Sequence, residues 1–224
     1  MPDFPAGVVF DLDGTLIESA PDLHLVLSEL FAEEGLAAPP LADLRTMIGD
    51  GARVLIERGL TAAEAPYDTA RLDDLYARFL ERYVAEPCRA STVYPGVFPV
   101  LDALRDAGAR LGICTNKPQR PSELLLQILG LEPYFPCLLG GDALSGIRKP
   151  DPRHLTAVLD RLDVPAEQAV MVGDSRNDLI TARAAGLPCI LFSHGYTTIP
   201  AADLGADAVL DHFDELLPAL ARFA

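Results

Sequence analysis

Short segments of strand-forming residues alternate with amphipathic helical segments from residue 93 to the end of the chain. The expected strands lie at residues 111–114, 137–139, 170–172, 189–192 and 208–210. The expected helices lie before, between and after them, at residues 97–107, 122–129, 152–162, 177–185 and 213–221. Because successive strands joined by helices favour parallel crossovers, this pattern predicts a mainly parallel sheet with helices on both faces.

A long helical stretch separates the first expected strand from this alternation. Residues 8–10 form a short apolar run, which predicts a buried strand. Between residues 19 and 90, apolar residues recur at one-face helical spacing, and Ser19 and Asp22 give an S-x-x-D helix start signal. We therefore expect an α/β fold with a doubly wound, Rossmann-like core, residues 1–18 and 91–224, and a helical insert at residues 19–90.

The charge and the apolar pattern argue against several classes of partner. Eighteen Lys and Arg against 33 Asp and Glu give a net charge of -15, which repels nucleic-acid backbones and anionic membranes. No apolar run approaches the roughly 18 residues of a membrane span, and residues 1–7 lack the pattern of a signal peptide. We expect a cytoplasmic monomer or homodimer that binds neither nucleic acid nor membrane.

Lysine is rare in this chain. Only Lys117 and Lys149 are lysines among the 18 cationic residues. A site built around one phosphate oxygen could require the compact ammonium of lysine rather than the planar guanidinium of arginine. A nucleotide bias that leaves two accidental lysines is the alternative explanation.

Two carboxylates follow the first expected strand, in Asp11-Leu12-Asp13-Gly14-Thr15. The two-residue period of a strand would point Asp11 and Asp13 the same way, and Gly14 allows a sharp turn. The two charges repel by roughly 1 to 4 kcal/mol at ~4 Å unless a cation lies between them. The pair therefore predicts a metal site or a raised pKa, with Asp11 able to act as nucleophile and Asp13 as acid and base. A turn with two solvated acids is the alternative.

Polar residues also follow two later strands, where ligands of an open parallel sheet bind. Thr115 and Asn116 come directly after residues 111–114, and their hydroxyl and amide suit phosphate oxygens. Lys149 follows the next strand, and its ammonium would neutralise both the nucleophile and a bound phosphoryl group. The alternatives are an ordinary exit from a strand and an ordinary surface lysine.

Two more acids follow the strand at residues 170–172. Asp174 leaves the strand, and Asp178 returns to the same side four residues later if a helix starts at once. A hard cation such as Mg²⁺ prefers oxygen ligands, so a few carboxylates at two strand ends are sufficient to bind it. Acids in the first turn of a helix are also stabilising caps, which is the alternative. Four polar motifs at strand ends are nevertheless hard to explain without one common site.

These four segments, in this order, resemble the four motifs of the haloacid dehalogenase superfamily. The resemblance implies that Asp11 is the phosphorylated nucleophile and Asp13 the general acid and base. It implies that Thr115, with Asn116, and Lys149 bind the phosphoryl group. It further implies that Mg²⁺ is bound by the carboxylates of Asp11 and Asp174 and by the backbone carbonyl of Asp13. Asp178 is expected to support these ligands rather than to bind the metal, and the insert at residues 19–90 is expected to be a helical cap domain.

Further segments resemble the phosphoglycolate phosphatases of this superfamily. They are Ser19-Ala20-Pro21-Asp22, Ile48-Gly49-Asp50-Gly51-Ala52, Tyr94-Pro95-Gly96-Val97, Thr115-Asn116-Lys117-Pro118, Gly140-Gly141-Asp142 and residues 172–178. The resemblance implies a phosphatase that hydrolyses a small phosphomonoester, above all 2-phosphoglycolate, through an aspartyl-phosphate on Asp11. Dehalogenases of the superfamily lack the second acid, so the presence of Asp13 favours phosphate chemistry.

Substrate selection is expected to lie in the cap. Gly49 and Gly51 allow a close approach of the backbone, and Arg45 or Arg53, with Arg53 preferred, could pair with a substrate carboxylate. A solvated helix arginine is the alternative for Arg53.

Three other functions stay open. A phosphosugar phosphatase would need no change in the core residues. A phosphosugar mutase would also share them but return the phosphoryl group to the substrate. A non-catalytic phosphate-binding protein would need a broken site, and all the expected site residues are present.

Overall fold

A six-stranded parallel sheet forms the centre of the computed structural model, which describes residues 4–224. Its strand order is β5-β4-β1-β6-β7-β8, and the first expected strand pairs with β4 on one side and β6 on the other. The strands are β1 (Gly7–Phe10), β4 (Arg110–Cys114), β5 (Cys137–Leu139), β6 (Ala169–Gly173), β7 (Cys189–Phe192) and β8 (Ala208–Leu210). The predicted α/β class and parallel sheet are therefore confirmed.

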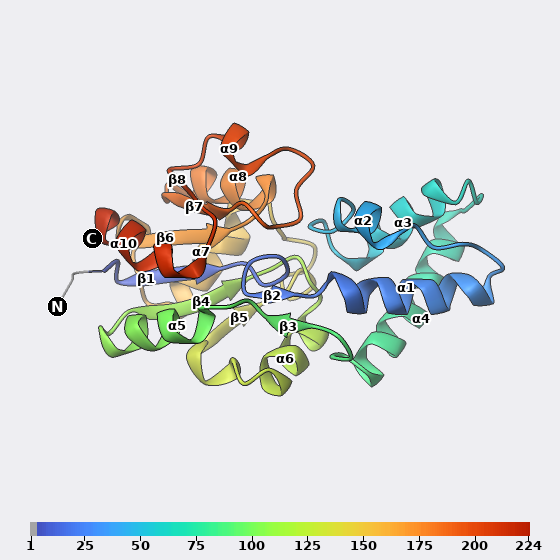
Figure 1. Ribbon diagram of the computed structural model, residues 1–224, viewed down its shortest axis with the longest axis horizontal. Helices are drawn as coiled ribbons and strands as arrows, with labels where there is room; N and C mark the ends of the chain where they lie inside the picture. Colours follow the sequence, from blue (N-terminus) through green and yellow to red (C-terminus); the bar gives the residue numbers. More distant parts are fainter. Residues whose placement is uncertain (1–3) are drawn as a thin grey trace.

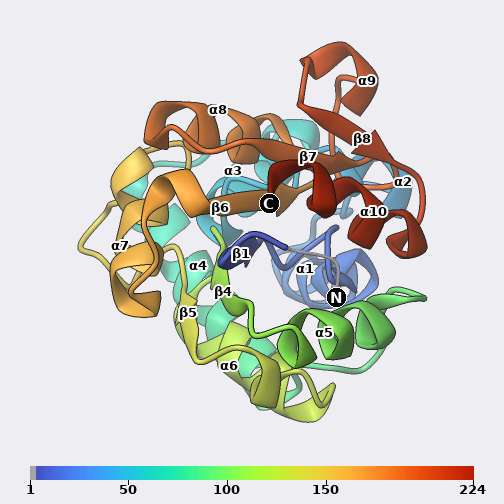
Figure 2. The same ribbon diagram turned by 90° about the vertical axis from the view of Figure 1, so that its left-hand side faces the viewer.

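Helices cover both faces of this sheet, as the alternation predicts (Figure 2). Val8 and Phe10 of β1 pack into one apolar cluster with α5 (Val97–Asp106), α6 (Gln119–Ile128) and α10 (Leu216–Leu220). Val9, between them, points to the opposite cluster with α7 (Pro152–Leu162), α8 (Arg176–Ala185) and α9 (Ala201–Leu204). A strand buried on both faces reads as a continuous apolar run, which is why residues 7–10 contain no polar side chain.

Short 3₁₀ helices account for most differences from the expected helices. The helix expected at residues 213–221 is divided into η3 (Phe213–Glu215), α10 and η4 (Ala221–Phe223). Two further 3₁₀ turns, η1 (Glu132–Tyr134) and η2 (Ala166–Gln168), precede β5 and β6. Helix α6 begins at Gln119, earlier than expected, because Pro121 lies in its first turn, where the missing N–H would have no helical partner.

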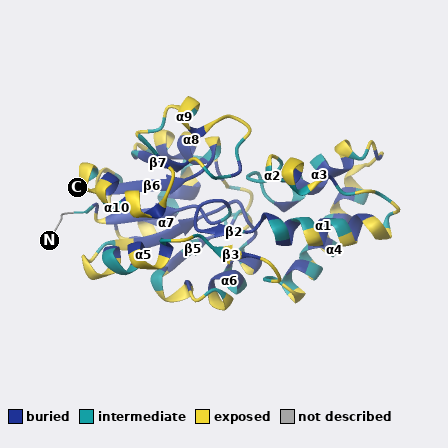
Figure 3. Ribbon diagram, viewed as in Figure 1, coloured by how far each residue is buried: buried dark blue, intermediate teal, exposed yellow. Residues whose placement is uncertain are grey.

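The remaining helices form a second layer beyond the carboxyl ends of the strands (Figure 1). They are α1 (Ala20–Glu33), α2 (Leu41–Arg45), α3 (Ala52–Ala62) and α4 (Thr69–Ala85). Buried residues gather where these helices face one another and in the strands of the sheet, whereas the outer faces of the helices are exposed (Figure 3). Two short strands, β2 (Ile17–Glu18) and β3 (Thr92–Val93), pair antiparallel where the chain passes between the layers.

Asp22 holds together the two segments through which the chain enters and leaves the helical layer. Helix α1 begins where the S-x-x-D signal predicts, but Ser19 makes no side-chain capping bond. The buried carboxylate of Asp22 instead accepts hydrogen bonds from the backbone N–H groups of Arg89, Ala90 and Ser91, at 2.7–3.2 Å, and from the Ser91 hydroxyl at 2.5 Å. The acid of the start signal therefore binds residues 89–91, where the chain leaves the helical layer, and does not cap the first turn of α1.

Across residues 4–224, no helix combines the length and the apolar character that crossing a membrane requires.

Candidate active site

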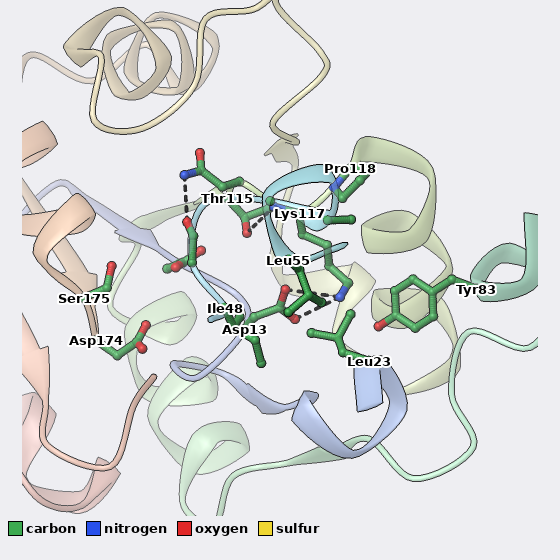
Figure 4. Close-up of a pocket in the computed structure, with 15 residues that line it drawn as sticks. Asp13, Leu23, Ile48, Leu55, Tyr83, Thr115, Lys117, Pro118, Asp174 and Ser175 are labelled. Atoms are coloured by element: carbon green, nitrogen blue, oxygen red, sulfur yellow. Dashed lines mark hydrogen bonds and ion pairs between the residues drawn. The ribbon is translucent and has the colours of Figure 1, made fainter. Parts of the chain in front are cut away.

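The carboxyl ends of β1, β4 and β6 meet at a cavity under the helical layer. Asp11 and Asp13 follow β1, Thr115 follows β4, and Asp174 follows β6, so four predicted site residues line the same cavity. The complete lining is Asp11, Asp13, Leu23, Ile48, Gly49, Gly51, Ala52, Leu55, Tyr83, Thr115, Asn116, Lys117, Pro118, Asp174 and Ser175 (Figure 4). Core loops supply the charged groups, and the helical layer supplies most of the apolar ones.

Three buried carboxylates lie together at the core side of the site. Asp11, Asp174 and Asp178 each place one oxygen within 4.8 Å of the others. Burial raises the pKa of Asp11 to about 6, although the neighbouring Lys149 opposes the shift. Burial, together with the charges of Asp178 and Asp11, raises the pKa of Asp174 well above its usual value. A hard divalent cation among these oxygens would relieve the repulsion, so the residues present fit such an ion.

Donors of the protein already hydrogen-bond to both oxygens of the Asp178 carboxylate. Its Oδ2 accepts from the Ser175 hydroxyl at 2.7 Å and from the backbone N–H groups of Ser175 and Asp174 at 3.0 and 3.2 Å. Its Oδ1 lies 2.6 Å from the ammonium of Lys149. Asp178 thus fixes the loop that carries Asp174.

Lys149 connects this cluster to Asp11. Its ammonium is buried and lies 2.9 Å from Asp11 Oδ1 and 2.6 Å from Asp178 Oδ1. The charges of Asp11 and Asp178 raise the pKa of Lys149 against the opposing effect of burial, so the group stays cationic. The scarce lysine at this position therefore faces two acids inside the site, and it is no ordinary surface residue.

Asn116 links the core to the helical layer. Its Nδ2 donates to the backbone oxygens of Gly49 at 2.8 Å and Lys149 at 3.0 Å. Gly51 has a φ of +90°, and a Cβ on it would lie 3.0 Å from the Asn116 carbonyl oxygen. Both predicted loop glycines thus line the cavity against the core. The amide hydrogens of Asn116 bind carbonyls here, so any contact with phosphate would involve its backbone.

Tight packing supports the loop that carries Thr115 and Asn116. A Cβ on Gly141 would lie 2.5 Å from the Asn116 carbonyl oxygen, and Asp142 Oδ1 accepts from the backbone N–H of Gln119 at 2.7 Å. The segment Gly140-Gly141-Asp142 therefore has a structural explanation, because only glycine permits this approach.

Arg53 lies away from the cavity. Its guanidinium pairs with Asp73 of α4 at 2.8 Å, and 38% of its side chain is exposed. Arg45 pairs with Glu18 at 2.8 Å. Neither arginine is among the residues that line the cavity, so this arrangement gives no support to their predicted contact with a substrate carboxylate.

Lys117 and Tyr83 also line the cavity, although neither was among the site residues that we predicted from the sequence. The Lys117 ammonium lies 3.0 and 3.2 Å from the two carboxylate oxygens of Asp13 and 4.5 Å from the centre of the Tyr83 ring. The scarcity of lysine was a signal for Lys117, since both lysines of the chain face acids of this site. Tyr83 belongs to the apolar face of α4 and gave no separate signal.

The site combines paired acids, a lysine and a hydroxyl at the carboxyl edge of a parallel sheet, below a helical insert. This combination defines a hydrolase of the haloacid dehalogenase class. A family model described as haloacid dehalogenase-like hydrolase matches residues 5–186, and the chain belongs to this family.

Relatives within the family carry more specific names. A curated phosphoglycolate phosphatase from Rhodospirillum rubrum is 47% identical over 217 residues, which cover 95% of this chain and 89% of that protein. The crystal structure of a predicted phosphoglycolate phosphatase from Haemophilus somnus superposes with a TM-score of 0.88 at 30% identity, covering 96% of this chain and 97% of that one. CbbY from Rhodobacter sphaeroides, solved with phosphate, gives a TM-score of 0.82 at 29% identity, covering 96% and 99% of the two chains.

Proposed function

We propose that this protein is a phosphatase that hydrolyses a small phosphomonoester, with 2-phosphoglycolate as the preferred substrate, through an aspartyl-phosphate on Asp11. The observation that carries the proposal is the convergence of Asp11, Asp13, Thr115 and Asp174 on one cavity, with Lys149 in contact with Asp11. Phosphoglycolate phosphatases related at 47% and 45% identity support the choice of substrate.

The buried oxygens around Asp11 favour Mg²⁺ as the cofactor. The carboxylates of Asp11 and Asp174 and the backbone carbonyl of Asp13 would hold it, with Asp178 supporting Asp174. Bound there, the ion would neutralise charge on the phosphoryl oxygens.

In the proposed reaction, an Asp11 carboxylate oxygen attacks phosphorus in line with the bond to the leaving oxygen. Asp13 gives a proton to the leaving oxygen as the P–O bond breaks. Asp13 then takes a proton from the water that attacks the aspartyl-phosphate, and phosphate leaves. Lys149 orients Asp11 and offsets the negative charge that gathers at the phosphoryl group, and the Thr115 hydroxyl donates to a phosphoryl oxygen in the proposed complex.

Residues 19–90 are proposed to act as a cap domain over a core of residues 1–18 and 91–224. The helices α1–α4 lie together beyond the sheet, and the chain enters and leaves them through the β2–β3 pair. A cap joined at two neighbouring points can open to admit substrate and close to exclude water.

The substitution Asp11→Asn tests this function. We expect a folded protein that releases phosphate from 2-phosphoglycolate at least about 1000-fold more slowly than the wild type, because an amide is a poor nucleophile. Asp160→Asn, on the exposed face of α7, is the matched control and should retain full activity. Phosphate release by Asp11→Asn at the wild-type rate would contradict the proposed nucleophile.

A phosphosugar phosphatase is the second candidate, favoured by the similarity to CbbY, which has also been solved with xylulose-(1,5)-bisphosphate. A panel of phosphorylated metabolites ranked by kcat/KM separates the two, because the proposed substrate should rank first. Transfer of the phosphoryl group to a sugar without release of phosphate would indicate a mutase instead.

A further inference from the structure

Lys117 is the one cationic residue, within residues 4–224, that lines the cavity. It comes from the core loop after β4, and its ammonium reaches between Asp13 and Tyr83 (Figure 4). Only 2% of its side chain is exposed. A buried ammonium is costly unless it is paired, so this group has a strong preference for an anionic partner.

The only acid that pairs with Lys117 among the described residues is Asp13. Asp13 is also the acid proposed to exchange protons with the leaving oxygen and with water. An acid held by both of its oxygens, at 3.0 and 3.2 Å, is not free to face a leaving oxygen. A second anion at Lys117 would release Asp13 while keeping the ammonium paired.

Tyr83 supplies a hydroxyl at the same place. It is 1% exposed, and its hydroxyl has no hydrogen-bond partner within residues 4–224. Figure 4 shows the hydroxyl end of the ring turned toward the cavity. Burial raises the pKa of Tyr83 to about 12, so the group remains a hydrogen-bond donor. An unpartnered buried hydroxyl costs free energy, and a ligand oxygen would satisfy it.

Apolar side chains form much of the cavity wall. Leu23 and Leu55 of the helical layer line the same cavity as Lys117, together with Ile48 and Ala52. Apolar walls lower the local dielectric constant and so strengthen an ionic contact. One ammonium and one hydroxyl match a single carboxylate, whereas a second phosphate would call for more donors.

We propose that Lys117 and Tyr83 bind the carboxylate of the substrate and thereby select carboxylated phosphomonoesters. This inference rests on the proposed phosphatase function and deepens it by naming the residues that choose the substrate. The phosphoryl group lies at Asp11, Thr115 and Lys149, and the carboxylate lies at the other end of the same cavity. Because Lys117 belongs to the core and Tyr83 to α4, the carboxylate site is complete only when the two layers are together.

Two phosphate esters of equal carbon-chain length test the proposal in the presence of Mg²⁺. In 2-hydroxyethyl phosphate, a CH₂OH group replaces the carboxylate of 2-phosphoglycolate. For Lys117→Met, we expect the ratio of kcat/KM for 2-phosphoglycolate to kcat/KM for 2-hydroxyethyl phosphate to fall about 10- to 100-fold. A decrease in kcat/KM that is equal for both substrates reports on the contact between Lys117 and Asp13. Only a change in the ratio of the two kcat/KM values reports on carboxylate binding.

Tyr83→Phe provides a milder variant that removes only an oxygen atom. We expect the same ratio to fall about 3- to 10-fold. Tyr67→Phe, at a 38% exposed residue between α3 and α4, is the matched control and should leave the ratio unchanged. Lys149→Met should lower both kcat/KM values together, because Lys149 faces the nucleophile rather than the proposed carboxylate end.

Binding of two phosphonates gives a readout that does not depend on turnover. By calorimetry, 3-phosphonopropionate should bind the wild type more tightly than propylphosphonate, and Tyr83→Phe and Lys117→Met should both reduce that preference. An unchanged preference in both variants, with an unchanged kcat/KM ratio, would overturn the carboxylate site while leaving the phosphatase intact. A wild type that releases no phosphate from either ester would instead overturn the proposed function.

Discussion

Asp11 combines burial with two neighbouring acids, and the energetic consequence depends on pH. Its pKa is raised from 3.8 to about 6, chiefly by burial, with Lys149 acting in the opposite direction. The folded protein therefore holds the Asp11 proton to a higher pH than the unfolded chain does. A carboxyl group of this kind destabilises the folded state once it ionises.

We expect the contribution of Asp11 to the free energy of unfolding to decline as pH rises from about 4 to about 6. Below this range the group is protonated in both states, and above it the loss is complete, at up to about 3 kcal/mol. The measurement is urea unfolding of the metal-free wild type and of Asp11→Asn at several pH values, since their difference isolates this group. Saturating Mg²⁺ should diminish the decline. A difference that stays flat or grows with pH would contradict the burial of an ionisable Asp11.

The sequence identified the site residues that follow strands, because parallel strands bring their carboxyl ends to one edge of the sheet. Asp11, Thr115 and Asp174 follow three neighbouring strands for this reason. Tyr83 could not be recognised, because its helical period is that of a core residue and only the packing of α4 turns its hydroxyl into the cavity. The partner of Arg53 was equally hidden, since Asp73 meets it only through the packing of α3 on α4.

At the level of elements, apolar runs predicted the strands of the sheet to within one residue at either end. Residues 8–10 were expected where β1 spans Gly7–Phe10, and residues 189–192 coincide with β7. Strands β2 and β3 were not predicted, because two residues are too few to show a period. The two strands pair because segments far apart in the sequence meet there, and the hydrogen bonds of Asp22 hold those segments together.

Removal of the Asp22 side chain should destabilise the protein strongly. Asp22→Ala leaves the N–H groups of residues 89–91 without their acceptor, and we expect a loss of about 2 to 4 kcal/mol in the free energy of unfolding. Urea unfolding followed by circular dichroism measures it. Asp73→Ala is the control, because its pair with Arg53 is exposed and should contribute far less. Equal and small effects of the two substitutions would show that the connections are held by other contacts.

At the scale of the whole molecule, the core and the helical layer contact each other across the site. The oxygen of Gly49 accepts from Asn116 at 2.8 Å and from Asn177 at 3.3 Å, and Asn177 also donates to Asp50 Oδ1 at 2.8 Å. Asp50 pairs in turn with Arg58 of α3. These contacts between the layers are few and partly exposed, and such contacts suit the proposed cap, which would open and close during turnover.

In the proposed reaction, distant parts of the chain meet to transfer one phosphoryl group to Asp11. The most direct measurement is rapid acid quenching of the Mg²⁺-loaded enzyme during turnover of 2-phosphoglycolate, followed by mass spectrometry of its peptides. We expect a phosphoryl group on Asp11 that disappears once the substrate is exhausted. Phosphate release with no modification of Asp11, or with the phosphoryl group on another residue, would contradict it.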